Sequence, residues 1–397
     1  MRFEPFLLDQ WIERKFSPEW KIEHDFSASS GPSWTLGELL ALGGEESIEQ
    51  LLRTPIVYPS AAGCAELRSA VAELEGASPD DVQIVTGAQE GLLAIFFAAA
   101  EPGANVVLPH PGFAPFTAVP RSFGLEVRHY HLRPENQFAV DVEEVMKLAD
   151  ARTALVLVNS PHNPSGAVLA ETDRRALHDF CAGRRIQFVC DQVFHPIFHG
   201  PGTSTAATLP NATIVGDFSK ALCLTGLRVG WIIDRDHDRL ETYRDARTYF
   251  TVSNSPITEW LAVLAVRHRD EVYARARDFS AANLQRIESS WSSTSEIAWV
   301  KPQGGFTVFP WLRGERDTRP LCERLGARGI LAVPGDCFDM PSHMRIGFGT
   351  EPQRFGMGFD RLCEELEAYF AERHRQSHHL NQLEPIASDA ERAIHGR

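Results

Sequence analysis

The sequence has few features that would support a disulfide framework or a metal centre. Its seven cysteines, at positions 64, 181, 190, 223, 322, 337 and 363, are widely spaced and include no Cys-x-x-Cys pair. This usage indicates a reducing compartment. His195 and His199 stand four residues apart, but Pro196 lies between them and no acid accompanies them at helical spacing, so we expect no metal site.

Basic charge and long apolar runs are also scarce. The 39 Lys and Arg residues are outnumbered by 53 Asp and Glu residues, and no basic stripe accompanies the net charge of −14, so we expect no nucleic-acid partner. The longest apolar stretch, Gly91–Ala100, is too short to cross a bilayer. The opening Met1-Arg2-Phe3-Glu4 is unlike a secretory leader, so we expect a cytoplasmic protein without a membrane partner.

From about residue 82, short apolar runs alternate with helix-like stretches. This pattern predicts an α/β fold with a mostly parallel seven-stranded sheet, covered by helices on both faces. Ligands of such sheets lie outside the carboxyl ends of the strands. The seven runs are Val82–Thr86, Asn105–Leu108, Leu125–His129, Thr153–Asn159, Ile186–Cys190, Ala212–Val215 and Val229–Ile233.

The C-terminal part of the chain has a different pattern. Helical periodicity dominates from Ile257 to Ser290, and short apolar runs at Ile297–Lys301, Gly305–Phe309 and Met344–Gly347 then predict a smaller α+β domain. We expect residues 1–45 to form an N-terminal arm and part of this small domain, and residues 46–280 to form the large domain. Residues 281–375 complete the small domain, and the polar residues 376–397 form a loosely held tail.

One connection between two of the predicted strands carries a lysine, Lys220, among small and polar neighbours. Lysine is seldom buried without a partner, and one chemistry that needs it is a Schiff base between a lysine of lowered pKa and an aldehyde. Arg228, eight residues later, offers a planar donor group suited to phosphate. The alternative is an ordinary surface loop.

Two further turns follow predicted strands. Gly87, Ala88 and Gln89 open a helix, where small residues and the helix dipole favour a phosphate, although most such turns bind nothing. Phe113, in Pro111-Gly112-Phe113, is suited either to stacking on a planar ring or to packing under the loop.

Three polar side chains complete the candidate site. Asn163 lies in the stiff segment Asn159–Gly166 and can donate to a phenolate oxygen. Asp191 ends an apolar strand, where a protonated pyridine nitrogen is a fitting partner and a helix N-cap is the alternative. Arg345, inside a strand, predicts bidentate capture of a carboxylate or, alternatively, a structural salt bridge.

Taken in this order, over about residues 20–370, the motifs resemble the fold-type-I pyridoxal-phosphate enzymes of the class I/II aminotransferase family. The resemblance implies a homodimer with pyridoxal 5'-phosphate as cofactor and a free α-amino acid as substrate. It implies that Lys220 forms the Schiff base and that Asp191 pairs with the ring nitrogen. The other implied cofactor contacts are Gly87, Ala88, Gln89, Phe113, Asn163, Phe194, Ser219, Arg228 and, from a second subunit, Tyr58. The implied substrate contacts are Arg345, Asn163, Ser30 and Gly31.

Two positions depart from the family pattern. Phe194 stands where most members have a tyrosine, and Asp217 stands where a small hydroxyl residue usually meets the phosphate, so we expect Asp217 to point away or the phosphate to be held differently. These departures resemble a subgroup that includes capreomycidine synthase. That resemblance implies elimination from, and cyclisation of, a hydroxylated arginine, with Glu13, Glu23 and Asp25 as candidate guanidinium partners.

Two alternatives stay open at this stage. The first is ordinary transamination between an amino acid and a 2-oxo acid, which needs the same lysine and arginine. The second is a cofactor-binding sensor without turnover, like the aminotransferase-like domains of some transcription regulators. Those regulators carry a basic DNA-binding domain, and the sequence shows no such region.

Overall fold

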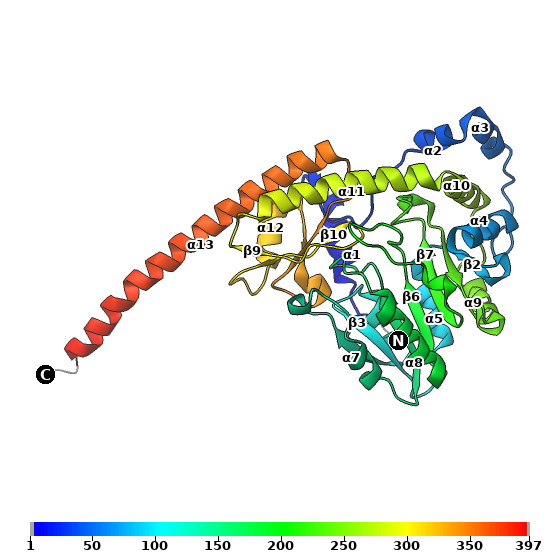
Figure 1. Cartoon of the computed structure of the whole chain (residues 1–397). Coiled ribbons are helices and arrows are strands. Elements are labelled where there is room, and N and C mark those ends of the chain that lie inside the picture. Colours follow the sequence, from blue (N-terminus) through cyan, green and yellow to red (C-terminus); the bar gives the residue numbers. More distant parts are fainter. Residues whose placement is uncertain (1–3, 395–397) are drawn as a thin grey trace.

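A seven-stranded sheet forms the centre of the protein (Figure 1). The computed structural model describes the backbone of residues 4–394 and the side chains of residues 4–375. The strand order is β2-β8-β7-β6-β5-β3-β4, and only β8 runs antiparallel to its neighbours, so the predicted mostly parallel sheet is confirmed. Each strand coincides with one predicted apolar run: β2 (Val82–Val85), β3 (Asn105–His110), β4 (Glu126–His131), β5 (Thr153–Asn159), β6 (Gln187–Asp191), β7 (Ala212–Asp217) and β8 (Gly230–Ile233).

Helices cover both faces of this sheet and create two apolar cores. Along β5, Leu155 and Leu157 face one core while Val156 and Val158 face the other, as the two-residue period of a strand requires. Burial on both faces explains why the strands are continuous apolar runs. The first core is covered by α5 (Ala88–Ala98), α6 (Pro115–Ser122) and α9 (His237–Phe250), and the second by α4 (Ala65–Glu75), α7 (Val142–Leu148), α8 (Glu171–Arg184) and α10 (Pro256–Arg267).

The smaller α+β part is built from short strands. In it, β14 (Met344–Gly347) lies between β10 (Thr307–Val308) and β13 (Val333–Pro334), and all pairings are antiparallel. The N-terminal segment joins this part because β1 (His24–Asp25) pairs in parallel with β12 (Ile330–Leu331). The remaining elements are β9 (Ile297–Ala298), which pairs with β11 (Trp311–Leu312), and α12 (Arg319–Ala327).

Two long helices connect and extend the molecule. The expected boundary near residue 280 falls inside α11 (Arg269–Trp291), which continues from the large part into the small one. The first turns of α13 (Pro352–Ile394) contact α11, and α13 then projects away from the body (Figure 1). The expected tail, residues 376–397, is therefore helical as far as Ile394, and its last three residues lie outside the described part.

The N-terminal region contributes short helices. These are α1 (Leu7–Ile12), α2 (Leu36–Leu42) and α3 (Gly44–Leu52). Helix α2 starts at a capping box in which the Thr35 hydroxyl accepts the Glu38 N–H and the Glu38 carboxylate accepts the Thr35 N–H. Single 3-10 turns occur at η1 (Glu13–Phe16), η2 (Pro79–Asp81), η3 (Pro134–Asn136), η4 (Ala206–Thr208), η5 (Thr225–Leu227) and η6 (Gly335–Phe338).

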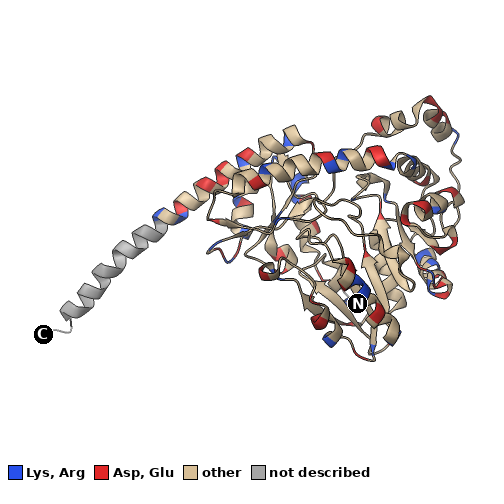
Figure 2. Ribbon diagram, in the orientation of Figure 1, with Lys and Arg blue, Asp and Glu red and all other residues tan. Residues whose placement is uncertain are grey.

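Charged residues of both signs are distributed along the helices (Figure 2). Within the described residues, no helix combines the length and the apolar character needed to cross a bilayer.

Candidate active site

A cavity of about 440 Å³ lies at the carboxyl ends of three adjacent strands. Asn159, Asp191 and Asp217 end β5, β6 and β7, and the parallel register places Asn159 directly beside Asp191. The cavity brings together most of the predicted site residues: Ser30, Ala88, Gln89, Phe113, Asn163, Asp191, Phe194, Ser219, Lys220, Arg228 and Arg345.

Lys220 and Asp191 supply opposite charges to this cavity. The Lys220 Nζ donates to the Ser29 hydroxyl at 3.1 Å, and burial lowers the pKa of Lys220 although the carboxylate of Asp217 raises it. Burial raises the pKa of Asp191 to about 7, although the Val193 N–H and the Asn159 amide both donate to its Oδ1 at 3.2 Å. A cationic partner in the cavity would restore the full charge of this carboxyl group.

The amino end of α5 forms an anion-binding corner. Gly87, its N-cap, has φ 73° and ψ 162°, and a Cβ there would lie 2.5 Å from Arg228 Nη2. Arg228 Nη1 donates to the Ser219 hydroxyl at 3.0 Å. A helix N-terminus, a hydroxyl and a guanidinium thus converge where a phosphate would be stabilised. Asp217 lines the same cavity, with its Oδ1 held by the Ser219 N–H at 2.9 Å.

Arg345, on β14, is a buried guanidinium whose donors are only partly used. Its Nη1 donates to Asn163 Oδ1 at 3.1 Å and its Nη2 to the Ser27 carbonyl at 2.6 Å, while Nε is buried without a partner. Burial lowers the pKa of Arg345 to about 10. No acidic side chain of the described residues forms an ion pair with it, which removes the alternative of a structural salt bridge.

Asn163 lines the same cavity and is held in place by two hydrogen bonds. Its backbone N–H donates to Asn159 Oδ1 at 2.9 Å, and its own Oδ1 accepts from Arg345. Its Nδ2 has no partner among the described residues, so this amide retains a donor that can be directed at a ligand.

Two phenyl rings also line the cavity. The Phe113 ring is partly buried and meets Phe6 edge-on at 5.6 Å and Phe116 at 5.8 Å, so it packs under the loop and still lines the cavity. Phe194 is buried beside Phe306, with 6.3 Å between ring centroids. A phenylalanine at this position offers a ligand no hydroxyl.

Several predicted residues do not line the cavity. Gly87 lies beside Arg228, which lines the cavity, but does not line it itself. Gly31 is closely packed, since a Cβ there would lie 2.3 Å from Cys223 Sγ. Tyr58 is 85% exposed and lies outside the cavity of its own chain. His199 Nε2 lies 2.7 Å from the Gly305 carbonyl oxygen, and His195 Nε2 lies 3.2 Å from that of Thr203.

Glu13, Glu23 and Asp25, the expected candidate partners for a guanidinium, do not line this cavity. Asp25 lies 3.6 Å from the Lys15 ammonium and accepts hydrogen bonds from Ser27. The residues that the sequence did not reveal are those defined by tertiary contacts, namely Ser29 beside Lys220, Asn159 beside Asp191, and Asp9 at the cavity edge.

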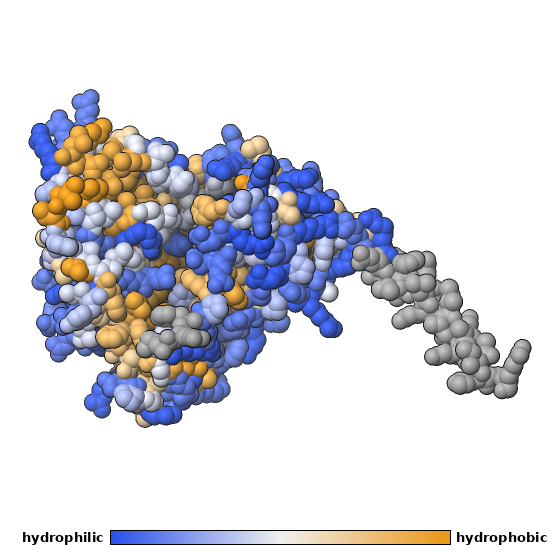
Figure 3. Space-filling view, turned by 180° about the vertical axis from the view of Figure 1, so that it is seen from behind, coloured by the Kyte–Doolittle hydropathy of each residue, from blue (hydrophilic) through white to orange (hydrophobic). Residues whose placement is uncertain are grey.

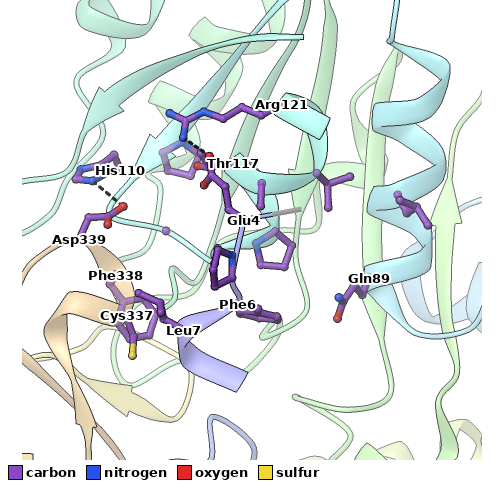
Figure 4. A pocket seen from close by; sticks show the side chains of 18 of the residues that line it. Glu4, Phe6, Leu7, Gln89, His110, Thr117, Arg121, Cys337, Phe338 and Asp339 are labelled. Carbon is purple, nitrogen blue, oxygen red and sulfur yellow. Dashed lines mark hydrogen bonds and ion pairs between the residues drawn. The ribbon is translucent and has the colours of Figure 1, made fainter. Parts of the chain in front are cut away.

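A second, larger cavity of about 780 Å³ adjoins the first and shares Phe6, Gln89 and Arg228 with it. Figure 4 shows two ion pairs at its wall, Glu4 with Arg121 at 3.0 Å and His110 with Asp339 at 3.7 Å. The second pair joins the end of β3 to the turn after η6, and hence the large part of the molecule to the small one.

Comparison with known proteins places these features in a family. The model for aminotransferase class I and II matches residues 46–362. Capreomycidine synthase of Streptomyces vinaceus is 33% identical over 93% of this chain and 95% of its own length. Aspartate aminotransferase of Thermococcus kodakarensis is 29% identical over 81% of this chain and 84% of its own. The solved structure of the PLP-dependent cyclase OrfR superposes with a TM-score of 0.84 at 26% identity, covering 94% of this chain and 98% of the other. The chain therefore belongs to the class I and II aminotransferase family of pyridoxal-phosphate-dependent enzymes.

Proposed function

We propose that this enzyme acts on a hydroxylated arginine, removing its hydroxyl group and closing a ring through its guanidine nitrogen. The observation that carries the proposal is a cavity that contains a lysine, an aspartate at a strand end and an arginine without an ion-pair partner among the described residues. The chain is also similar to capreomycidine synthase over nearly its whole length. The structural likeness to a cyclase supports the same reaction class.

The cavity has the donors and acceptors that pyridoxal phosphate requires. Lys220 provides the amine for the aldehyde, Asp191 the carboxylate for the ring nitrogen, and the unused Asn163 Nδ2 a donor for the ring oxygen. The corner of Gly87, Ala88, Gln89, Ser219 and Arg228 would hold the phosphate, and Phe113 and Phe194 would provide apolar contacts for the ring. When bound, the cofactor supplies an electron sink for the electron pair left on Cα.

The substrate is held by its carboxylate. Arg345 has an unpartnered Nε and forms no ion pair with an acid of the described residues, so a carboxylate entering the cavity compensates a guanidinium whose hydrogen-bond acceptors are all neutral. Asn163 and the Ser27–Ser30 segment surround the same position. This anchoring fixes Cα relative to Lys220, which the transfer of a proton requires.

Lys220 is the group that moves protons. Its pKa is lowered by burial, so its amine is available as a base and takes the proton from Cα. The resulting ammonium then donates a proton to a hydroxyl group leaving the adjacent carbon. A guanidine nitrogen adds to that carbon and loses its proton, and Cα regains one. The net change is the loss of one water, so no oxidant or amino acceptor is needed.

The second candidate is transamination of an amino acid with a 2-oxo acid, favoured by the similarity to aspartate aminotransferase. Product analysis separates the two. The purified enzyme is incubated with hydroxyarginine and no oxo acid, and the products are identified by mass spectrometry. A cyclic guanidine formed over many turnovers supports cyclisation. A keto acid formed in one equivalent, with the cofactor converted to its amine, supports transamination and refutes the proposal.

We also propose that the enzyme works as a homodimer. Figure 3 shows an apolar area on the face opposite to that of Figure 1, over the region of α2 and α3. Exposed apolar side chains in this region and the following loop include Leu36, Ile48, Leu52, Ile56, Val57 and Tyr58. An area of this kind favours association, and a second copy would bring Tyr58 toward a neighbouring cavity. Light scattering should give twice the monomer mass for the wild type, and Ile56→Glu should shift it toward the monomer; a monomeric wild type contradicts the proposal.

A further inference from the structure

We propose that Asp9 recognises a cationic substrate side chain at the edge of the active-site cavity. The proposal rests on the proposed function, because it assumes that a free amino acid is anchored by its carboxylate at Arg345. It assigns to Asp9 the selection of a guanidinium side chain over a neutral one of similar shape.

The charges that line the cavity single out this residue. The carboxylates that line the cavity are Asp9, Asp191 and Asp217. Asp191 accepts hydrogen bonds from Asn159 and Val193, and Asp217 accepts from Ser219. Asp9 has neither a hydrogen bond nor an ion pair with any side chain of the described residues, although it lines the same space. Of the three carboxylates, Asp9 is the one that no hydrogen bond from the described residues engages, so both of its oxygens are available to a cation.

The cations of the cavity do not use Asp9. Lys15 lies 3.6 Å from Asp25, and Arg228 donates to Ser219 and to the Thr225 carbonyl. Lys220 donates to Ser29 and Arg345 to Asn163. These cations would repel an incoming guanidinium, whereas Asp9 would attract it. We therefore expect the substrate side chain to lie at the edge of the cavity formed by α1.

Helix α1 holds Asp9 in a defined position. Leu8 and Trp11, three residues apart, are buried on one side of the helix, and Trp11 Nε1 donates to the Ala332 carbonyl at 2.8 Å. Phe6, just before the helix, packs against the cavity residue Phe113. Asp9 itself is exposed, while Ile12 and Lys15 line the cavity with it. The carboxylate is therefore displayed from an anchored helix.

The size of the effect follows from this exposure. A fully exposed ion pair contributes little, whereas a charged hydrogen bond shielded by bound substrate contributes more. We expect loss of the Asp9 charge to weaken the binding of arginine about 10-fold, between these two limits. A neutral side chain of the same length should be unaffected.

The test uses the full-length enzyme with its cofactor bound. Changes in the visible absorbance of the cofactor are titrated with L-arginine and with L-citrulline, whose side chain is neutral and of similar shape. We expect the wild type to favour arginine, and Asp9→Asn to lose about 10-fold of that preference through weaker arginine binding alone. Glu13→Gln is the matched control, because Glu13 follows α1, is exposed and does not line the cavity.

The outcomes separate the two proposals. If Asp9→Asn keeps the wild-type preference, or if Glu13→Gln loses it equally, the assignment of Asp9 is wrong while the proposed function stands. If the wild type binds both amino acids without preference, the assignment also fails. If neither amino acid nor hydroxyarginine changes the absorbance of the wild type, the proposed function fails, and the assignment fails with it.

Discussion

Replacing Gly87 by alanine tests the anion-binding corner most directly, because the structure provides two independent reasons for glycine there. Its backbone, at φ 73° and ψ 162°, lies in a region that only glycine adopts readily, and a Cβ would lie 2.5 Å from Arg228 Nη2. The backbone effect acts on the free protein, and the displacement of Arg228 acts on cofactor binding. Gly87→Ala should therefore change two separate measurements.

The magnitudes follow from each cause. Forcing alanine into this backbone region costs about 1–3 kcal/mol of folding free energy. If the displaced Arg228 loses one charged hydrogen bond to a phosphate, binding weakens by about 1.5–3 kcal/mol, which is about 10- to 150-fold in the dissociation constant.

Gly226→Ala is the matched control. Gly226 lies in η5, two residues before Arg228, with a negative φ and no heavy atom within 4 Å of the position that a Cβ would take. Chemical denaturation of the cofactor-free variants measures stability, and titration with pyridoxal phosphate measures affinity. If Gly87→Ala matches Gly226→Ala in both measurements, then neither the strained backbone nor the position of Arg228 matters as argued, and the phosphate site lies elsewhere.

Three further changes test other parts of the cavity. Lys220→Ala should abolish the visible absorbance band of the bound cofactor and the activity, because the covalent link and the base are both removed; a retained band would overturn the assignment. Phe194→Tyr should lower the pKa seen in a pH titration of that band, because a hydroxyl donating to the ring oxygen favours the unprotonated form of the Lys220 linkage. An unchanged titration would mean that residue 194 does not face the ring. Burial raises the pKa of Asp191 to about 7, so the folded cofactor-free protein binds this proton more tightly than the unfolded chain and loses stability as pH rises from about 4 to 7. In thermal denaturation, the melting temperature of Asp191→Asn should fall less than that of the wild type over this pH range. An identical fall would contradict the raised pKa of Asp191.

The central sheet was predictable because its strands are buried on both faces. Burial of this kind removes the polar alternation and leaves apolar runs between turns, and all seven runs became strands. The small part was harder, since strands such as β9 and β10 have two residues each and depend on their partners more than on local sequence. The expected boundary near residue 280 coincides with no break between elements and stays a prediction. Helix α11 is continuous from Arg269 to Trp291, so the local sequence gives no turn signal at that position.

Within the cavity, the sequence located residues that follow strands, because the carboxyl ends of parallel strands meet at one edge. It could not locate Ser29, whose contact with Lys220 spans 191 positions of the chain. Gly31, a substrate contact implied by the resemblance, does not line the cavity, and a Cβ there would lie 2.3 Å from Cys223 Sγ. Glu13, Glu23 and Asp25 all follow α1 in the chain and do not line the cavity, whereas Asp9, within α1, does, and which of these acids reaches the cavity depends on how the N-terminal segment packs.

Arg345 explains why the site needs both parts of the molecule. Its guanidinium comes from β14 of the small part, but its partners are the Ser27 carbonyl from the N-terminal segment and the Asn163 amide from the large part. A buried cation whose hydrogen-bond partners are neutral is costly, and under the proposed function a substrate carboxylate would relieve that cost only while all three segments are assembled. An amine without a carboxylate leaves the guanidinium uncompensated and its Nε unpaired. On the proposed role of Arg345, the discrimination between amino acids and simple amines would therefore arise from the same contacts that join the two parts of the chain.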